Sequence, residues 1–242
     1  MLKEYRKGLL HGLPIALGYL SVAFAFGIQA TSLGLTPVQA LLISMTNVTS
    51  AGQLAGLQLM AGGAGLAEMA LTQLTINLRY SLMSLSLSQK LDKSMTLLHR
   101  LLISFCNTDE VFAVASQQPG TIGKVYLYGL TNGPWLGWAL GTLLGALAGS
   151  FLPISVTNAL GIAIYAMFIA IVLPPFRENE KIRIVILIAV TLSCVLNLVS
   201  VFSFLSDGFR IILCAVISSA LGAWLWPAAE TQEKTDSESP DE

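Results

Sequence analysis

Three short polar stretches interrupt an otherwise apolar chain of 242 residues: residues 44–53, 68–84 and 107–110. The first holds hydroxyl and amide side chains around a glycine, the second holds an arginine, and the third holds two adjacent carboxylates. Such groups can receive a substrate carboxylate, pair with a charge or carry a proton. A protease or a metal site would need a mid-segment histidine or a second mid-segment aspartate, but both histidines lie at segment ends and Asp109 has no such partner. We therefore expect no enzymatic activity, no metal and no cofactor.

The first polar stretch lies in the middle of an apolar segment, about residues 37–61. Hydroxyl and amide groups beside a glycine can satisfy the backbone groups that an interrupted membrane helix leaves free, and transporters use such breaks to expose half-helix ends to a substrate. Small polar residues also pack membrane helices together, so a purely structural role stays open. The candidate substrate-binding residues in this stretch are Asn47, Thr49, Ser50, Gly52 and Gln53.

The second stretch predicts a polar stripe along one helix. Four residues spaced four, three and four apart form the stripe: Glu68, Thr72, Thr75 and Arg79. Four more flank it: Gln73, Asn77, Tyr80 and Ser84. Because a charge in mid-membrane costs about 2.5–3.5 kcal/mol on insertion scales, Arg79 should face a partner or a wet cavity. We take Asn77 and Arg79 as candidate substrate ligands, with a structural ion pair as the alternative for Arg79 and an interfacial position for Glu68.

The third stretch places two adjacent carboxylates, Asp109 and Glu110, after Asn107 and Thr108. Neighbouring side chains on a helix point about 100° apart, so at most one of the two carboxylates enters a given cavity easily. Burial favours the protonated form of a carboxyl group and a nearby cation favours the charged form, so either residue could titrate during a transport cycle. The pair could equally cap a broken helix at its N-terminus. We take Asp109 and Glu110 as candidate proton carriers and Asn107 as a candidate substrate ligand.

The composition excludes a soluble globular protein. Hydrophobic residues make up 54% of the chain and charged residues 11%, where soluble domains carry about 25%, and the mean hydropathy is +0.71. A net charge of −1 and a pI near 6.1 give no basic footprint for nucleic acid. The three cysteines lie far apart in apolar runs, which indicates small core residues rather than disulfides or metal ligands.

Glycine, proline and charge divide the chain into apolar segments long enough to cross a bilayer. They cover about residues 12–31, 37–61, 65–89, 96–117, 125–148, 154–173, 184–205 and 209–226. We therefore predict an all-α polytopic membrane protein of about six to eight transmembrane segments, with broken or re-entrant helices in segments two and four. It forms one domain over residues 1–229, followed by a disordered acidic tail over residues 230–242.

Segments two and four resemble each other. Aligning Thr36–Asn47 with Thr96–Asn107 matches the initial threonine, a Leu-Leu-Ile-Ser run and the final asparagine. Polar breaks at corresponding positions of two repeats point to a transporter binding site.

The distribution of positive charge bears on whether these two segments cross the membrane. If all eight segments cross and the N-terminus is inside, Lys90, Lys93 and Arg100 lie outside, against the positive-inside rule. If segments two and four dip in and return, those three residues lie inside and the two segments form an inverted pair. This favours six spans and two re-entrant segments with both termini cytoplasmic, and eight full spans remain the alternative.

Several motifs in order resemble the AzlC family, the large subunits of bacterial branched-chain amino acid exporters. They are Gly12-Leu13-Pro14, Gly18-Tyr19, Thr49-Ser50-Ala51-Gly52-Gln53-Leu54-Ala55-Gly56, Asn77-Leu78-Arg79-Tyr80 and Thr108-Asp109-Glu110. The resemblance covers roughly residues 8–220. One departure bears on side-chain specificity: residues 48–53 read Val-Thr-Ser-Ala-Gly-Gln, where the family more usually has Phe-Ala-Gly-Ala-Ser-Gln.

The resemblance implies export of branched-chain or other apolar amino acids, driven by an ion gradient, across the bacterial inner membrane. It also implies a second, small membrane subunit of the AzlD type. The expected partners are thus this subunit, the amino acid and membrane lipid, without nucleic acid. The absence of a Gly-Lys-Ser/Thr phosphate-binding motif agrees with a secondary transporter. The alternatives are a channel or a non-transporting membrane assembly subunit.

Overall fold

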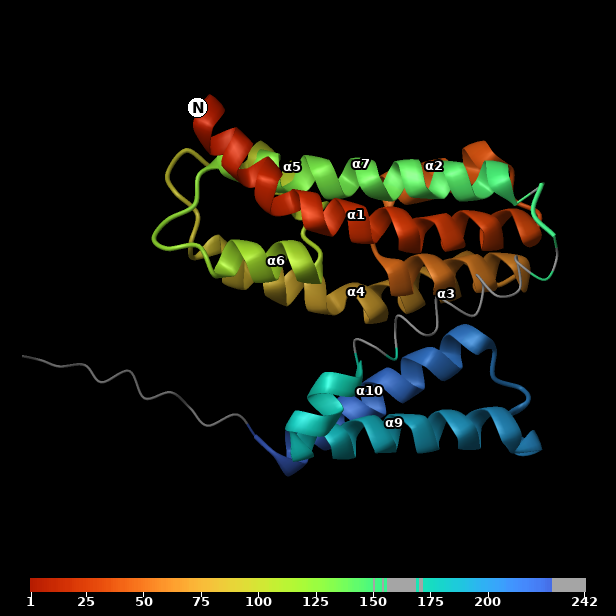
Figure 1. Ribbon diagram of the computed structural model, residues 1–242. Coiled ribbons are helices and arrows are strands. Elements are labelled where there is room, and N and C mark those ends of the chain that lie inside the picture. The colour runs from red at the N-terminus through yellow and green to blue at the C-terminus, as the bar shows by residue number, and fades with distance from the viewer. Residues whose placement is uncertain (150, 154, 156–168, 170–171, 228–242) are drawn as a thin grey trace, which may run out of the picture.

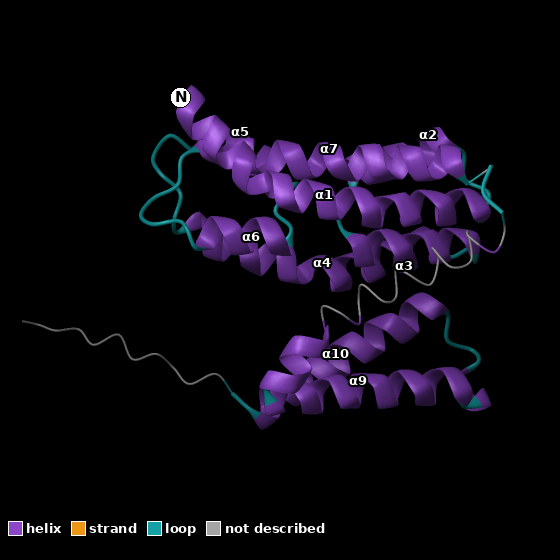
Figure 2. Ribbon diagram, viewed as in Figure 1, coloured by secondary structure: helices purple, strands orange, loops and turns teal. Residues whose placement is uncertain are grey.

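The regular structure of the described residues is helical (Figure 2), apart from one isolated bridge between Leu91 and Ile122. A computed structural model describes residues 1–149, 151–153, 155, 169 and 172–227. Within these residues, three helices are long and apolar enough to cross a membrane: α1 (Leu2–Ser32), α9 (Glu180–Leu198) and α10 (Asp207–Leu225). The all-α prediction is confirmed. The predicted segment at residues 154–173 lies almost entirely outside the described residues, and the predicted tail at residues 230–242 lies wholly outside them.

Helices α1 and α7 (Lys124–Ala148) run parallel and pack very closely (Figure 1). A glycine stands at every fourth position of α7: Gly129, Gly133, Gly137, Gly141 and Gly145. A Cβ atom added to Gly129 would lie 2.2 Å from the Tyr5 carbonyl oxygen, and one added to Gly145 would lie 1.9 Å from that of Phe24. Such small residues let two membrane helices touch backbone to backbone. We call this parallel pair the α1–α7 spine.

Segment two is a re-entrant hairpin made of α2 (Pro37–Thr46) and α3 (Ser50–Ala61). Thr36 caps α2 in a reciprocal capping box with Gln39, which fixes the start of the helix. The helix stops at Asn47, whose backbone is extended, and α3 then runs back toward the end of the bundle at which α2 begins (Figure 1). Ala40 of α2 and Leu57 of α3 accordingly pack in the same buried cluster, so the hairpin starts and ends at the same face of the bundle.

Segment four is a second re-entrant hairpin, made of α5 (Leu97–Ser104) and α6 (Asp109–Ser116), and it enters from the opposite end. Its tip meets the middle of α4 (Leu66–Ser88), where the Asn107 amide donates to Ser84 Oγ at 3.0 Å. Its outer end lies beside the end of α4, where Lys90 Nζ donates to the Ser116 carbonyl oxygen at 2.6 Å. The Thr108 hydroxyl caps α6 by accepting from the Val111 amide.

The two hairpins have the arrangement that the predicted inverted re-entrant pair requires. Helix α1 is followed by a hairpin inserted from the end that α1 reaches, and α4 is followed by a hairpin inserted from the end that α4 reaches (Figure 1). Residues 172–178 are also helical. Helices α9 and α10 are joined through a short 3₁₀ turn (η1, Ser200–Phe202) and pack against each other, and α10 packs against α4. Glu68 of α4 accepts from the Gly208 amide at 2.9 Å and from the Ser206 hydroxyl, so it lies at the N-terminus of α10.

We predict that Gly145→Ala destabilises the protein, because the new methyl group would overlap the Phe24 backbone and push the spine apart. Overpacking of this kind costs about 1–3 kcal/mol, read as a lower unfolding midpoint in detergent. The matched control is Gly133→Ala, whose added Cβ would have its nearest neighbour, Leu9 Cδ1, at 3.7 Å. Equal midpoints for the two variants would contradict the close packing.

A second prediction concerns which loops share a side of the membrane. In a cysteine-free background, single cysteines at the exposed positions Ser32, Ser94 and Asn179 are treated in intact cells with a membrane-impermeant thiol reagent. The inverted pair puts position 94 on the cytoplasmic side with position 179, so only position 32 should react until the cells are permeabilised. Labelling of position 94 in intact cells, with position 179 protected, would contradict the re-entrant arrangement.

Candidate functional site

Helix α4 turns a polar face toward the tips of both hairpins. Gln73 Nε2 donates to the Gly52 carbonyl oxygen at 2.7 Å, and Asn77 Nδ2 donates to Gln73 Oε1 at 3.0 Å. Ser84 accepts from the Asn107 amide about two turns further on. In the sequence these α4 residues flank the predicted polar stripe, whereas in the structure they form the face of α4 that contacts the hairpins. The beginning of the main stripe, with Glu68, instead faces α10.

An ion pair joins α4 to the tip of the second hairpin. Arg79 Nη2 lies 2.7 Å from Asp109 Oδ2, and it also donates to the Tyr80 hydroxyl at 3.0 Å. The guanidinium carbon lies 4.8 Å from the centre of the Tyr80 ring. The side chains of Arg79 and Asp109 are 49% and 44% exposed, so this is an open pair, which stabilises a fold only weakly. Both charges are therefore accessible to a ligand.

Glu110 points to a different helix. Its carboxylate is hydrogen-bonded to the Tyr19 hydroxyl of α1, and the same hydroxyl lies 2.6 Å from Thr108 Oγ1. Because a tyrosine hydroxyl has one proton, it can donate to a charged Glu110 only while Thr108 donates to it. Asp109 and Glu110 thus diverge to α4 and α1, as their neighbouring positions on a helix require.

The tip of the first hairpin is anchored to α7 by a chain of buried hydrogen bonds. Trp138 Nε1 donates to Gln53 Oε1 at 2.8 Å, and Gln53 Nε2 donates to Ser44 Oγ at 2.9 Å. Ser44 Oγ in turn lies 2.6 Å from Thr142 Oγ1. Both hydrogen-bonding atoms of the Gln53 amide are therefore engaged with protein groups. A packing role describes Gln53 better than the substrate-binding role expected from sequence.

Gly52 also serves packing in this structure. A Cβ atom added there would lie 2.3 Å from Thr49 Oγ1 and 2.9 Å from Gln73 Oε1, and its carbonyl oxygen accepts from Gln73. The absence of a side chain lets α3 approach α4 closely. Gly52 therefore supports the candidate site through the packing of α3 on α4. Its neighbours Thr49 and Ser50 line the cavities described next.

A cavity of about 580 Å³, here called the central cavity, lies between the hairpin tips and the spine. Its polar lining residues are Tyr19, Ser21, Ser50, Arg79, Tyr80, Thr108, Asp109 and Glu110. Its apolar lining residues include Ile15, Val22, Val48, Ile76 and Trp138. A smaller cavity of about 230 Å³, here called the tip cavity, is lined by the candidate residues Asn47, Thr49, Asn77 and Asn107. The two cavities share Val48 and Tyr80, so the predicted site residues gather around two adjoining spaces.

Two helix N-termini face the central cavity, and they differ in charge. The first turn of α6 carries Asp109 and Glu110. The first turn of α3 carries no acidic residue, and its N-cap Thr49 donates to Asn47 Oδ1 at 2.9 Å instead of capping the helix. The positive end of the α3 dipole is thus left without a protein anion. The cavity therefore offers one anion-binding end and one cation-binding end.

Sequence reasoning did not select Tyr19, Tyr80 or Trp138 as site residues. Tyr19 and Trp138 belong to the spine, and their rings meet edge to face at a centroid distance of 5.0 Å. Each of the three residues is an aromatic ring with a polar group at its edge, inside an apolar segment. This pattern is the sequence signal that could have selected them, because such a polar group needs a hydrogen-bond partner when it is buried.

Comparisons with known proteins agree with the sequence motifs. The family model described as "AzlC protein" matches residues 14–152, which run from α1 through α7 and include both hairpins. The chain is 33% identical to "Inner membrane protein YgaZ" of Escherichia coli over 74% of this chain and 76% of that protein. It is 34% identical to an "Uncharacterized membrane protein" of Archaeoglobus fulgidus over 91% of this chain and 94% of that protein. No solved structure matches the chain.

We predict that Tyr19 and Glu110 are energetically coupled. Tyr19→Phe should lower the unfolding midpoint, because it removes the hydroxyl that Glu110 and Thr108 share, and the same change in a Glu110→Gln background should cost less. Groups in direct contact show coupling of about 0.5–3 kcal/mol. The control is Tyr5→Phe, whose hydroxyl accepts from exposed Asn132 far from Glu110. Strictly additive effects of Tyr19→Phe and Glu110→Gln would rule out the contact.

Proposed function

The chain belongs to the AzlC family, and on that premise we propose that it is a secondary transporter that exports branched-chain or other apolar amino acids. The main support is the central cavity, which combines an anion-binding helix end, a pair of carboxylates and an apolar wall. An apolar α-amino acid carries the complementary groups: a carboxylate, an ammonium group and an aliphatic side chain.

The substrate carboxylate belongs, in this proposal, at the N-terminus of α3. Ser50 and Ala51 line the central cavity there, and the amide N–H groups of a first helical turn have no partner within the helix. A helix N-terminus of this kind binds carboxylates well, and broken helices in transporters use it for substrate anions. Asn47 and Thr49 adjoin this position from the tip cavity.

The substrate ammonium group belongs at the N-terminus of α6, beside Glu110. Arg79 already balances the charge of Asp109, since the two side chains are 2.7 Å apart. With all three groups charged, Glu110 leaves the cavity with one negative charge in excess. Either a proton or the ammonium group of an amino acid can neutralise this charge, but the two cannot bind there at the same time.

Competition between these two cations at Glu110 provides the proton coupling. A site that carries either a proton or an amino acid exchanges one for the other as it alternates between the two faces of the membrane. Protons flowing inward down their gradient would then drive amino acids outward. The sign of the pH effect follows from this competition: a higher proton concentration at one face should weaken amino acid binding at that face.

The side-chain pocket accounts for a broad preference among apolar amino acids. Its wall is aliphatic and aromatic, with residues such as Ile76 and Trp138. One methylene group changes binding in such a pocket by only about 1–3 kcal/mol. Overlapping use of valine, leucine, isoleucine and methionine is therefore part of the proposal.

The remaining parts of the proposal follow from the family. A small AzlD-type membrane subunit completes the exporter, which lies in the bacterial inner membrane with both termini cytoplasmic. A channel is the second candidate, and it would need a ring of like charge around a pore. The opposed charges of Arg79 and Asp109 favour the transporter over the channel.

The proposal predicts a specific phenotype for Glu110→Gln. In proteoliposomes that contain this chain and its small subunit, the variant should exchange leucine for labelled leucine only at a raised half-saturating concentration, because it lacks the charge that binds the ammonium group. An imposed pH gradient should no longer drive net flux. Glu4→Gln, which removes an acidic residue at the start of α1 outside the central cavity, serves as the matched control and should behave as the unmodified protein.

Two results would contradict parts of this proposal separately. Equal retention of every preloaded amino acid in cells with and without the chain and its small subunit would overturn the export function. Unchanged gradient dependence in both Asp109→Asn and Glu110→Gln would overturn the coupling role of the carboxylates while leaving export in place.

A further inference from the structure

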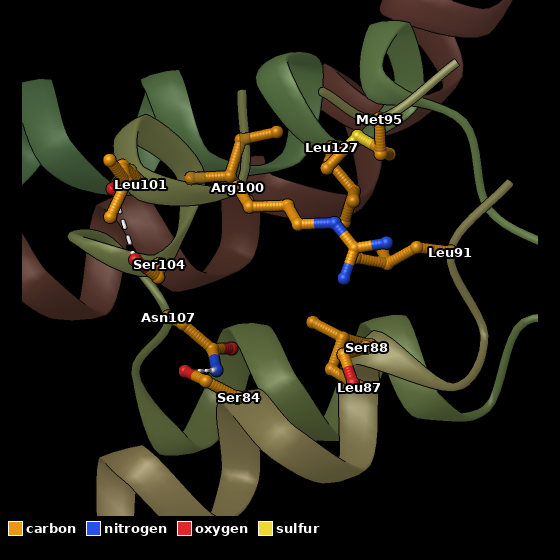
Figure 3. Close-up of a pocket in the computed structure, with 11 residues that line it drawn as sticks. Ser84, Leu87, Ser88, Leu91, Met95, Arg100, Leu101, Ser104, Asn107 and Leu127 are labelled. Atoms are coloured by element: carbon orange, nitrogen blue, oxygen red, sulfur yellow. Dashed lines mark hydrogen bonds between the residues drawn. The ribbon is translucent and has the colours of Figure 1, made fainter. Parts of the chain in front are cut away.

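A third cavity, of about 150 Å³, lies where α4, α5 and the first half of α7 meet (Figure 3). Its volume is well above the 10–15 Å³ that a single water needs. Most of the wall is aliphatic or thioether: Leu87, Leu91, Met95, Leu101, Ile103 and Leu127. One cation, Arg100, completes it together with a few small polar groups, so we call this space the Arg100 cavity.

Arg100 is the only charged residue in the lining of this cavity. Figure 3 shows its side chain reaching from α5 into the space between Leu127, Leu91 and Ser88. Three salt bridges occur among the described residues, and Arg100 takes part in none of them. Arg100 is an exposed residue, so its guanidinium group lies where an anion from solution can reach it, and its fork of N–H donors matches a carboxylate.

Asn107 gives this cavity a second point of recognition. The residue is only 4% exposed, and its Nδ2 donates to Ser84 Oγ at 3.0 Å. Its Oδ1 atom is buried and has no hydrogen-bond partner. Because buried polar atoms are nearly always paired, an unpaired acceptor on a residue that lines the cavity is a partner for a donor that enters it. An ammonium group is such a donor.

The position of the Arg100 cavity connects it to the proposed transport site. It shares Ser104 and Asn107 with the tip cavity, which in turn shares Val48 and Tyr80 with the central cavity. The three spaces therefore follow one another from the Lys90 end of the bundle to its middle. This end carries the cations that the positive-inside rule assigns to the cytoplasm.

We propose that the Arg100 cavity is a vestibule that binds an apolar amino acid before it enters the central cavity. Arg100 receives the carboxylate, Asn107 Oδ1 accepts from the ammonium group, and the aliphatic wall holds the side chain. This inference rests on the proposed function, since it adds a loading step to the same export route. It assigns the first contact of the substrate to a residue on the cytoplasmic hairpin.

The test uses inside-out membrane vesicles from cells that express this chain with its small subunit, so that labelled leucine is supplied at the cytoplasmic face. Arg100→Gln should raise the half-saturating leucine concentration about tenfold or more, because a charge-assisted hydrogen bond is lost. The maximal rate should stay within about twofold, since the central cavity is intact. Arg100→Lys should restore part of the affinity, because it keeps the charge without the fork.

The matched control is Lys93→Gln, which removes an exposed cation at the same end of the bundle from outside all three cavities. It should leave both kinetic constants unchanged. A second variant, Ser88→Phe, fills the Arg100 cavity without changing its charge, and it should also raise the half-saturating concentration.

The outcomes separate the vestibule from the proposed function. Normal uptake with an unchanged half-saturating concentration in Arg100→Gln would overturn the vestibule alone. A loss of maximal rate without a change in that concentration would overturn it as well, because it would indicate a structural role. Vesicles that contain both subunits and take up no apolar amino acid would overturn the proposed function, and the vestibule with it.

Discussion

The close packing of α1 against α7 is the constraint on which the rest of the structure depends. Two helices that touch through glycine backbones have little freedom to slide or rotate, because every relative movement brings backbone atoms into collision. Both helices then contribute aromatic side chains that hold the hairpins. Trp138 of α7 anchors the first hairpin through Gln53, and Tyr19 of α1 anchors the second through Thr108 and Glu110.

Anchoring both hairpins to one rigid pair of helices places two helix N-termini in the same space. A helix N-terminus inside a membrane is costly unless something satisfies its amide groups. The second hairpin has Thr108 as a side-chain cap and two carboxylates in its first turn, and Arg79 balances the charge of Asp109. The first hairpin leaves its N-terminus open to the central cavity. This asymmetry between two otherwise similar hairpins gives the site its opposed charges, and the family model matches this same α1–α7 region.

The sequence by itself determined the fold class and the main topology. Its hydropathy requires membrane helices, and polar groups in the middle of two apolar segments require either a break or a buried partner. Positive charge near Lys90 then favours two segments that return to the side they came from. These conclusions depend on local composition and on the cost of placing charge in lipid, so no knowledge of tertiary contacts was needed. The family motifs follow from the sequence in the same way.

Only the tertiary structure decided which of the polar residues face a cavity. Gln53 and Asn107 look equivalent in sequence as amides at a helix break, yet Gln53 is fully hydrogen-bonded to protein and Asn107 keeps an open acceptor. The choice of Tyr19 as the partner of Glu110 likewise depends on how α1 lies against the second hairpin. Helical spacing tells which residues share a face, but the identity of the opposite surface depends on packing between segments far apart in the chain.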